Sequence, residues 1–367
     1  MQFIDLAAQY KHLKARIDKR IQSVLDHGQY IMGPEVQELE SKLAEYVGVK
    51  HVITCANGTD ALTLALMALE IGEGDAVFVP TFTFFASAES VAYAKATPVF
   101  VDSDADTFNI CPIDLEKRIK AVISEGKLKL KAIMAVDLFG LPANYPEIQK
   151  IADKYSLKVI EDAAQGFGGE INGQRAGSFG NIATTSFFPA KPLGCYGDGG
   201  AIFTNNDEYA ELLRSYRVHG KGADKYDNVR IGMNSRLDTI QAAVLLEKLA
   251  EFPKELINRN IAAEKYEKSL ARKFKTPQVP EGYLSSWAQY TIVEPDRDAA
   301  MAAYRKEGIP TVVYYSKNMH EQTAFKELGC GIGDFPVAEK LSSVVFSLPI
   351  DGYMSKKRLS LISEVFS

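Results

Sequence analysis

The fold of this chain is decided by residues 132–165, which read AIMAVDLFGLPANYPEIQKIADKYSLKVIEDAAQ. Two short apolar segments, residues 132–136 and 158–160, enclose an amphipathic segment at 144–155, and this order predicts a strand, a helix and a second strand. Strands joined through a helix run parallel in one sheet. Because both strands are almost wholly apolar, we expect helices to cover the sheet on both faces.

The same alternation extends in both directions from this unit. Residues 34–47 predict a helix that begins at a proline and ends before a glycine. A strand at 51–55, a polar turn at 57–60 and an apolar helix at 61–69 follow it. The other predicted elements of this region are strands at 76–79, 97–101, 183–188 and 200–203 and a helix at 207–216.

The pattern changes after about residue 245. A long helical stretch at 237–274, in which Pro253 is a candidate break, leads to a strand at 289–293, a helix, a second strand at 311–315 and a terminal helix. We therefore expect an α/β protein with two domains. Residues 1–250 form a large domain with a mostly parallel sheet between helices, and residues 251–367 form a smaller α+β domain. The first residues are compatible with packing on the small domain.

Composition excludes several classes of protein. The 367 residues are 46% hydrophobic, enough for two packed cores, and the net charge of -5 argues against nucleic acid or an anionic membrane as a partner. No run approaches the roughly 20 apolar residues of a membrane span. The N-terminal residues lack the apolar core of a signal peptide, which favours a cytoplasmic protein. The four cysteines are scattered without a CxxC pair, so we expect reduced thiols and no metal site.

Ligands of open α/β sheets bind at the carboxyl ends of the strands, and one predicted strand ends in Glu161 and Asp162 before small residues. For a single aspartate at such a position, a helix cap or a surface ion pair is the commoner role. A Mg²⁺ ligand is a further alternative, but the sequence has no phosphate-binding GxxxxGK[ST] loop to accompany it.

A second strand end carries Lys191, within residues 184–200, TTSFFPAKPLGCYGDGG. Most lysines lie on solvated surfaces, but this one is flanked by phenylalanine, proline and leucine. Desolvation lowers the pKa of a lysine and makes its amine nucleophilic, as a Schiff-base lysine requires. The glycines at 194–200 lack the G-x-G-x-x-G spacing, so we reject a dinucleotide site.

The turn at residues 57–60, Asn-Gly-Thr-Asp, precedes a predicted helix. Free backbone N–H groups and the helix dipole favour a phosphate there, although the same sequence is also an ordinary turn and cap. The three strand ends together supply what pyridoxal phosphate needs. Lys191 forms the imine, Asp162 pairs with the pyridine nitrogen so that the ring acts as an electron sink, and the turn holds the phosphate.

With these motifs, the sequence closely resembles the DegT/DnrJ family of fold type I aminotransferases, which act on nucleotide-linked keto-sugars. The resemblance extends nearly from end to end and implies pyridoxal 5'-phosphate as cofactor and L-glutamate as amino donor. It is carried, in this order, by residues 28–34 (GQYIMGP), 56–62 (ANGTDAL), 80–84 (PTFTF), 161–165 (EDAAQ), 186–191 (SFFPAK) and 232–238 (GMNSRLD).

The resemblance assigns roles to individual residues of these motifs. Lys191 is implied to be the Schiff-base lysine and the general acid and base, Asp162 the partner of the ring nitrogen, and Gln165 a donor to the ring hydroxyl. Asn234 is implied to reach the cofactor phosphate of a neighbouring subunit. This contact implies a homodimer with shared active sites. The other implied cofactor contacts are Gly58, Thr59 and Ser186 for the phosphate, and Phe84, whose ring would stack on the cofactor unless it packs in the core.

The substrate pocket departs from the family pattern. Many members carry a His-Tyr-Pro run, where this chain has Tyr314, Tyr315 and Ser316, followed by the retained His320. We expect both tyrosines and His320 to bind substrate, with Arg236 meeting an anionic group; a surface ion pair is the default for such an arginine.

The motifs look most like those of members that aminate the 3-keto group of UDP-2-acetamido-2-deoxy-3-oxo-glucuronate in lipopolysaccharide and O-antigen synthesis. Uncharged dTDP-linked 3-keto- or 4-keto-6-deoxyhexoses are the competing substrates. Two different functions are compatible with the same fold. One is a dehydratase, in which histidine replaces the Schiff-base lysine, and the second is a non-catalytic regulator. The presence of Lys191 and Asp162 argues against both.

Overall fold

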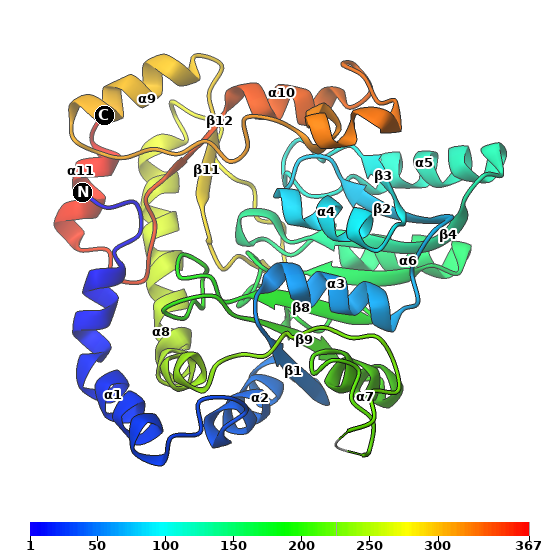
Figure 1. The fold of residues 1–367 in the computed structure, drawn as a ribbon. Coiled ribbons are helices and arrows are strands. Elements are labelled where there is room, and N and C mark those ends of the chain that lie inside the picture. Colours follow the sequence, from blue (N-terminus) through cyan, green and yellow to red (C-terminus); the bar gives the residue numbers. More distant parts are fainter. Residues whose placement is uncertain (225, 367) are drawn as a thin grey trace.

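The computed structural model describes residues 1–224 and 226–366, which are built around a seven-stranded sheet. Six of its strands point the same way, and β9 runs antiparallel to both of its neighbours. The predicted mostly parallel α/β architecture is therefore confirmed (Figure 1). The strands, in spatial order, are β1 (His51–Cys55), β9 (Gly200–Thr204), β8 (Ile182–Ser186), β5 (Lys158–Asp162), β4 (Lys129–Val136), β2 (Asp75–Pro80) and β3 (Thr97–Val101).

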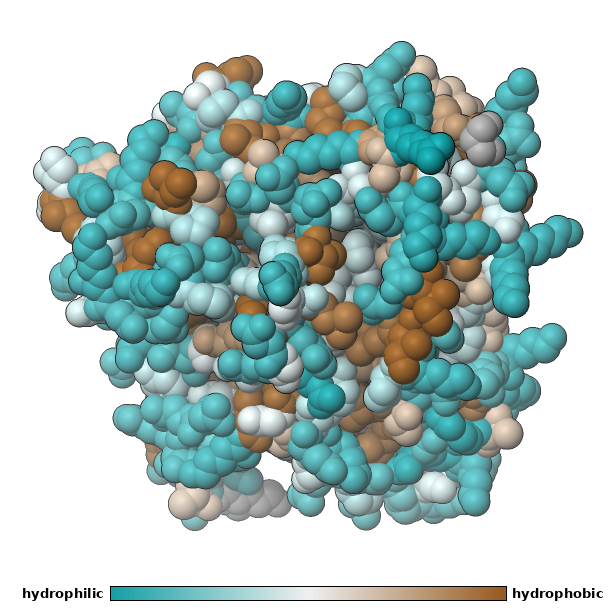
Figure 2. All heavy atoms as spheres, turned by 180° about the vertical axis from the view of Figure 1, so that it is seen from behind, coloured by the Kyte–Doolittle hydropathy of each residue, from teal (hydrophilic) through white to brown (hydrophobic). Residues whose placement is uncertain are grey.

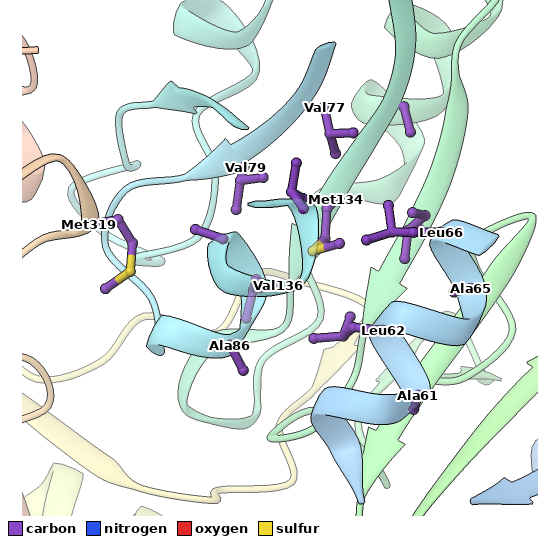
Figure 3. Close-up of a cluster of buried hydrophobic side chains, with 14 of the residues drawn as sticks. Ala61, Leu62, Ala65, Leu66, Val77, Val79, Ala86, Met134, Val136 and Met319 are labelled. Atoms are coloured by element: carbon purple, nitrogen blue, oxygen red, sulfur yellow. The ribbon is translucent and has the colours of Figure 1, made fainter. Parts of the chain in front are cut away.

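Helices cover both faces of this sheet because its central strands are apolar on both sides. In β4, Met134 and Val136 pack in the core of one face, and Ile133 and Ala135 pack in the core of the other. Figure 3 shows side chains of α3 directed towards those of β2 and β4. The first face carries α3 (Gly58–Ala68), α4 (Phe85–Tyr93) and α7 (Asp207–Tyr216), and the second carries α2 (Pro34–Val47), α5 (Pro112–Glu125), α6 (Tyr145–Tyr155) and part of α8 (Thr239–Leu270).

Two predictions for the C-terminal half are wrong. The helix α8 continues through Pro253, whose ring is exposed, because buried residues on either side, Phe252 and Leu256, hold the helix against the core. Residues 311–315 form no strand beyond an isolated bridge at Val312. The strand that pairs with β11 (Tyr290–Val293) is instead β12 (Val345–Leu348).

The N-terminal residues contact the C-terminal part of the chain, as the sequence allowed. Arg358 donates hydrogen bonds to the carbonyl oxygens of Gln2 and Phe3, and the N–H of Asp5 donates to Asp351 at 3.1 Å. Figure 1 shows both chain ends on the side of the molecule that carries α11 (Lys356–Ser363). Residue 250 lies inside α8, so the division into two domains at this point remains a prediction.

The remaining elements connect or flank these layers. None of the described helices has the length and apolarity to cross a membrane. Seen from behind, the surface is mainly hydrophilic, with apolar residues in small groups (Figure 2).

The elements that connect or flank the layers include α1 (Leu6–His27), which packs along α8. The others are α9 (Arg297–Lys306), α10 (Pro336–Val344), β6 (Glu170–Ile171), β7 (Gln174–Arg175), β10 (Tyr283–Leu284) and the 3₁₀ turns η1 (Leu138–Gly140), η2 (Met319–Glu321) and η3 (Thr323–Leu328).

Candidate active site

A cavity of about 470 Å³ lies at the carboxyl edge of the sheet, where the strands β1, β2, β4, β5 and β8 end. This is the place at which open α/β sheets bind their ligands. The cavity brings together nine of the residues predicted from sequence, from five separate segments of the chain. They are Gly58, Thr59, Phe84, Asp162, Gln165, Ser186, Lys191, Tyr314 and Tyr315.

The chemistry of the cavity centres on Lys191 and Asp162. Burial lowers the pKa of the Lys191 amine, and the negative charge of Asp162 acts in the opposite direction. Burial raises the pKa of Asp162, which is 5% exposed, while hydrogen bonds from Ser87 and Ala164 and the charge of Lys191 favour its ionised form. An amine that releases its proton easily therefore faces a carboxylate in one desolvated site.

Ser87 holds the Asp162 carboxylate and was not found from sequence. Its hydroxyl donates to Asp162 Oδ2 at 2.8 Å, and the N–H of Ala164 donates to Oδ1 at 3.2 Å. Ser87 lies in α4, where a serine among alanines carries no signal of a site. Only the folded chain, which brings Ser87 within hydrogen-bond distance of Asp162, reveals the contact.

The start of α3 fits an anion. A Cβ added at Gly58 would lie 2.7 Å from the Cβ of Ser186, so glycine permits the close approach of these two loops. Asn57 caps the helix by accepting from the N–H of Asp60. The N–H groups of Gly58 and Thr59, in the first turn, have no partner within the helix and are free to hold a phosphate.

Gln165 and Tyr315 are tied together on another wall of the cavity. Gln165 accepts a hydrogen bond from the N–H of Phe139 at 2.7 Å and donates to the Tyr315 hydroxyl at 3.0 Å. Burial raises the pKa of Tyr315, so this phenol stays protonated. The Phe84 ring is 54% exposed at the cavity, with its centroid 6.1 Å from that of Tyr315, so it is not a core residue.

The structure places His320 away from the cavity, so its contact with substrate remains a prediction. His320 is 4% exposed and does not line the cavity. Its Nδ1 lies 2.7 Å from the Thr81 hydroxyl, and its ring centroid lies 4.6 Å from that of Phe335. Burial lowers its pKa, which favours a neutral imidazole. The chain therefore uses His320 to attach the segment after Tyr315 to the end of β2.

Asn234 and Arg236 also lie outside the cavity of their own chain. Asn234 is exposed. Arg236 is partly exposed, and its side chain has no hydrogen-bond or ion-pair partner among residues 1–224 and 226–366. The predicted role of Asn234 at a neighbouring subunit remains a prediction. Within the described part of the chain, no cluster of His, Cys, Asp or Glu is arranged to hold a metal ion.

Comparisons with known proteins point to one family. Residues 11–366 match the DegT/DnrJ/EryC1/StrS aminotransferase family. The chain is 45% identical over 99% of its length to the UDP-2-acetamido-2-deoxy-3-oxo-D-glucuronate aminotransferase of Pseudomonas aeruginosa, and covers 98% of that protein. It is also 42% identical over 98% of its length to a pleiotropic regulatory protein of Geobacillus stearothermophilus, of which it covers 96%.

Solved structures agree with this result. A DegT/DnrJ/EryC1/StrS aminotransferase from Brucella abortus superposes with a TM-score of 0.98 at 53% identity, with 100% of this chain and 98% of that one covered. A Streptococcus pneumoniae protein solved in its PLP form has a TM-score of 0.87 at 25% identity, with 96% of this chain and 95% of that one covered.

Proposed function

The chain belongs to the DegT/DnrJ/EryC1/StrS aminotransferase family, and we propose that it transfers an amino group from L-glutamate to the 3-keto group of a UDP-2-acetamido-2-deoxy-3-oxo-glucuronate-type sugar. As a member of this family it is a pyridoxal-phosphate-dependent aminotransferase. The observation that carries the proposal is the pairing of Lys191, whose pKa is lowered by burial, with Asp162 in one cavity. Similarity to the Pseudomonas aeruginosa enzyme supports the sugar.

The residues of the cavity fit pyridoxal phosphate. When bound, this cofactor supplies an electron sink for the carbon that loses its proton. The Asp162 carboxylate would pair with the protonated ring nitrogen, and Gln165 would face the ring hydroxyl. Phe84 would cover the ring. The phosphate would be held at the start of α3 by Gly58 and Thr59 together with the Ser186 hydroxyl.

Lys191 moves the proton in this scheme. A general base works best when its pKa is near the operating pH, and burial shifts the Lys191 amine in that direction. Burial raises the pKa of Asp162, and the hydrogen bonds that Ser87 and Ala164 donate to its two oxygens oppose this effect by favouring the ionised form. Tyr315, fixed by Gln165, presents a protonated hydroxyl to the sugar.

The active unit is proposed to be a homodimer. Asn234 and Arg236 lie outside their own cavity, so they would serve the cavity of a partner subunit. Two apolar side chains are exposed, Phe188 at the cavity by 52% and Ile231, three residues before Asn234, by 89%. A second copy of the chain would cover these side chains and would deliver Arg236 to the carboxylate of the uronate. Such an enzyme would act in the cytoplasm, in the synthesis of bacterial surface polysaccharides.

A regulatory role is the second candidate, because the Geobacillus stearothermophilus relative bears that name. A regulator has no need for a lysine whose amine is activated beside a held carboxylate. Retention of both Lys191 and Asp162 therefore favours catalysis. Turnover of glutamate with any nucleotide keto-sugar would decide between the two functions.

The test of the substrate compares kcat/KM for the uronate and for its neutral counterpart. A guanidinium grips a carboxylate through two charged hydrogen bonds, each worth about 1.5–3 kcal/mol. Arg236→Ala should therefore lower kcat/KM for the uronate at least roughly 10- to 150-fold, the effect of losing one such bond, and leave the neutral sugar almost unchanged. Arg272→Ala is the control, because Arg272 is also an arginine but is exposed and does not line the cavity. Equal losses on both sugars would contradict the role of Arg236, and a wild-type preference for the neutral sugar would overturn the substrate.

A further inference from the structure

Gln289 is a buried polar side chain at the cavity to which the sequence assigned no role. It lies just before β11, lines the cavity and is 8% exposed. Its Oε1 atom is buried and has no hydrogen-bond partner among residues 1–224 and 226–366. Leaving such an acceptor unpaired costs about 1–3 kcal/mol, so its position needs a reason.

The backbone around Gln289 is held rigidly against the turn that follows β4. The N–H of Gln289 donates to the Phe139 carbonyl at 3.3 Å, and the N–H of Ser286 donates to that of Gly140 at 2.9 Å. A Cβ on Gly140 would lie 2.6 Å from the backbone nitrogen of Trp287, so the two segments are in close contact. The backbone of Gln289 is therefore held in place beside the cavity.

A second glutamine of the same cavity provides an internal comparison. Gln165 has both ends of its amide satisfied, since it accepts from the Phe139 N–H and donates to Tyr315. Phe139 thus donates to the side chain of Gln165 and accepts from the backbone N–H of Gln289, so both residues are anchored to the same turn. Gln165 has a protein partner at each end of its amide and keeps its second N–H for the cofactor, whereas the Oε1 atom of Gln289 has no partner in the described part of the chain.

We propose that Gln289 binds a hydroxyl group on the pyranose ring of the nucleotide-sugar substrate, an inference that rests on the proposed function. A hydroxyl both donates and accepts, so it can pair with either end of an amide. The only donor group of glutamate is its ammonium, which must reach the cofactor, and its two carboxylates only accept, so they leave Oε1 without a donor. Gln289 therefore contributes to recognition of the sugar and not of the amino donor.

The two half-reactions of the holoenzyme separate these roles. L-Glutamate alone drives the first half-reaction, which is monitored by the absorbance of the cofactor. The keto-sugar drives the second half-reaction. Gln289→Leu should lower kcat/KM for the sugar about 10-fold, the worth of one hydrogen bond, and leave the glutamate half-reaction unchanged. Gln278→Leu is the matched control, because Gln278 belongs to the same part of the chain but does not line this cavity.

Monodeoxy sugars identify the hydroxyl. One of them should react with the wild type about 10-fold more slowly than the parent sugar, and equally fast with wild type and Gln289→Leu. Equal losses in both half-reactions, or unchanged kcat/KM for the sugar, would overturn the role of Gln289 alone. Wild-type enzyme that turned over no nucleotide keto-sugar would overturn the proposed function and this inference with it.

Discussion

Replacing Ser87 with alanine should shift the acid side of the pH–activity profile to higher pH. The Ser87 hydroxyl donates to Asp162 Oδ2 at 2.8 Å, and both side chains are buried, with 1% and 5% exposed. This hydrogen bond favours the ionised carboxylate against the effect of burial, which raises its pKa. Without the donor, Asp162 should take up a proton at higher pH, and the site should lose the anion that we propose as the partner of the cofactor.

The size of the shift follows from the strength of the bond. A hydrogen bond to a charged group contributes about 1.5–3 kcal/mol, and one pKa unit corresponds to about 1.4 kcal/mol. Ser87→Ala should therefore raise the pKa of Asp162 by roughly one to two units. Activity that depends on the ionised form is then lost at a pH one to two units higher than in the wild type.

The assay is kcat/KM for the keto-sugar and glutamate, measured as a function of pH for both proteins. Ser90→Ala is the matched control, because Ser90 is buried on the same helix and donates to the Ser87 carbonyl without contacting Asp162. The control should keep the wild-type profile. Coincident acid limbs for wild type and Ser87→Ala would refute the reasoning, whatever the change in maximal activity.

Three further predictions follow from the same geometry. Asp162→Asn should lower the rate of transamination on the order of hundreds-fold or more, and near-normal turnover would contradict its role as the anionic partner. Lys191→Ala and Asn234→Ala, each inactive alone, should recover part of the activity when mixed, because one hybrid site regains both groups; a fully active monomer would exclude shared sites. Burial lowers the pKa of Lys248 to about 8, so between pH 8 and 10.5 the unfolded chain holds a proton that the folded protein has released. The free energy of unfolding should therefore rise with pH across this window, by up to about 3 kcal/mol more in wild type than in Lys248→Met. Parallel plots of the unfolding free energy against pH for the two proteins would contradict the lowered pKa of Lys248.

Local patterns in the sequence predicted most of the large sheet. The helix at 34–47 and the strands at 51–55 and 97–101 have the predicted bounds, because a proline, glycines and apolar runs mark them in the sequence. The strand predicted at 183–188 ends two residues earlier, at Ser186. Its last two phenylalanines have high strand propensity, but they belong to the loop that carries Lys191.

The C-terminal half depended on contacts that no local pattern records. Residues 311–315 have the composition of a strand, yet this segment leads Tyr314 and Tyr315 into the cavity, and β12 takes its place beside β11. The helix α8 survives Pro253 because tertiary packing outweighs the loss of one hydrogen bond.

The candidate site shows the same division. Lys191, Asp162 and the start of α3 were predicted because chemistry at the carboxyl ends of strands is visible in the sequence. Ser87 and Gln289 were missed because their importance arises only from the atoms that surround them in the folded chain. For His320, the resemblance indicated a position in the sequence but not the direction of the side chain, which lies against Thr81.

The most direct test of the account is to map the lysine that holds the cofactor. Borohydride reduction of the yellow holoenzyme should fix pyridoxal phosphate on the peptide that contains Lys191, and Lys191→Ala should yield no adduct. The structure offers a competitor in Lys248, which is 1% exposed, has a lowered pKa and donates to the Gly194 carbonyl at 2.6 Å, three residues beyond Lys191. An adduct on Lys191 is the predicted result, and an adduct on Lys248 or any other lysine would contradict the assignment on which the mechanism rests.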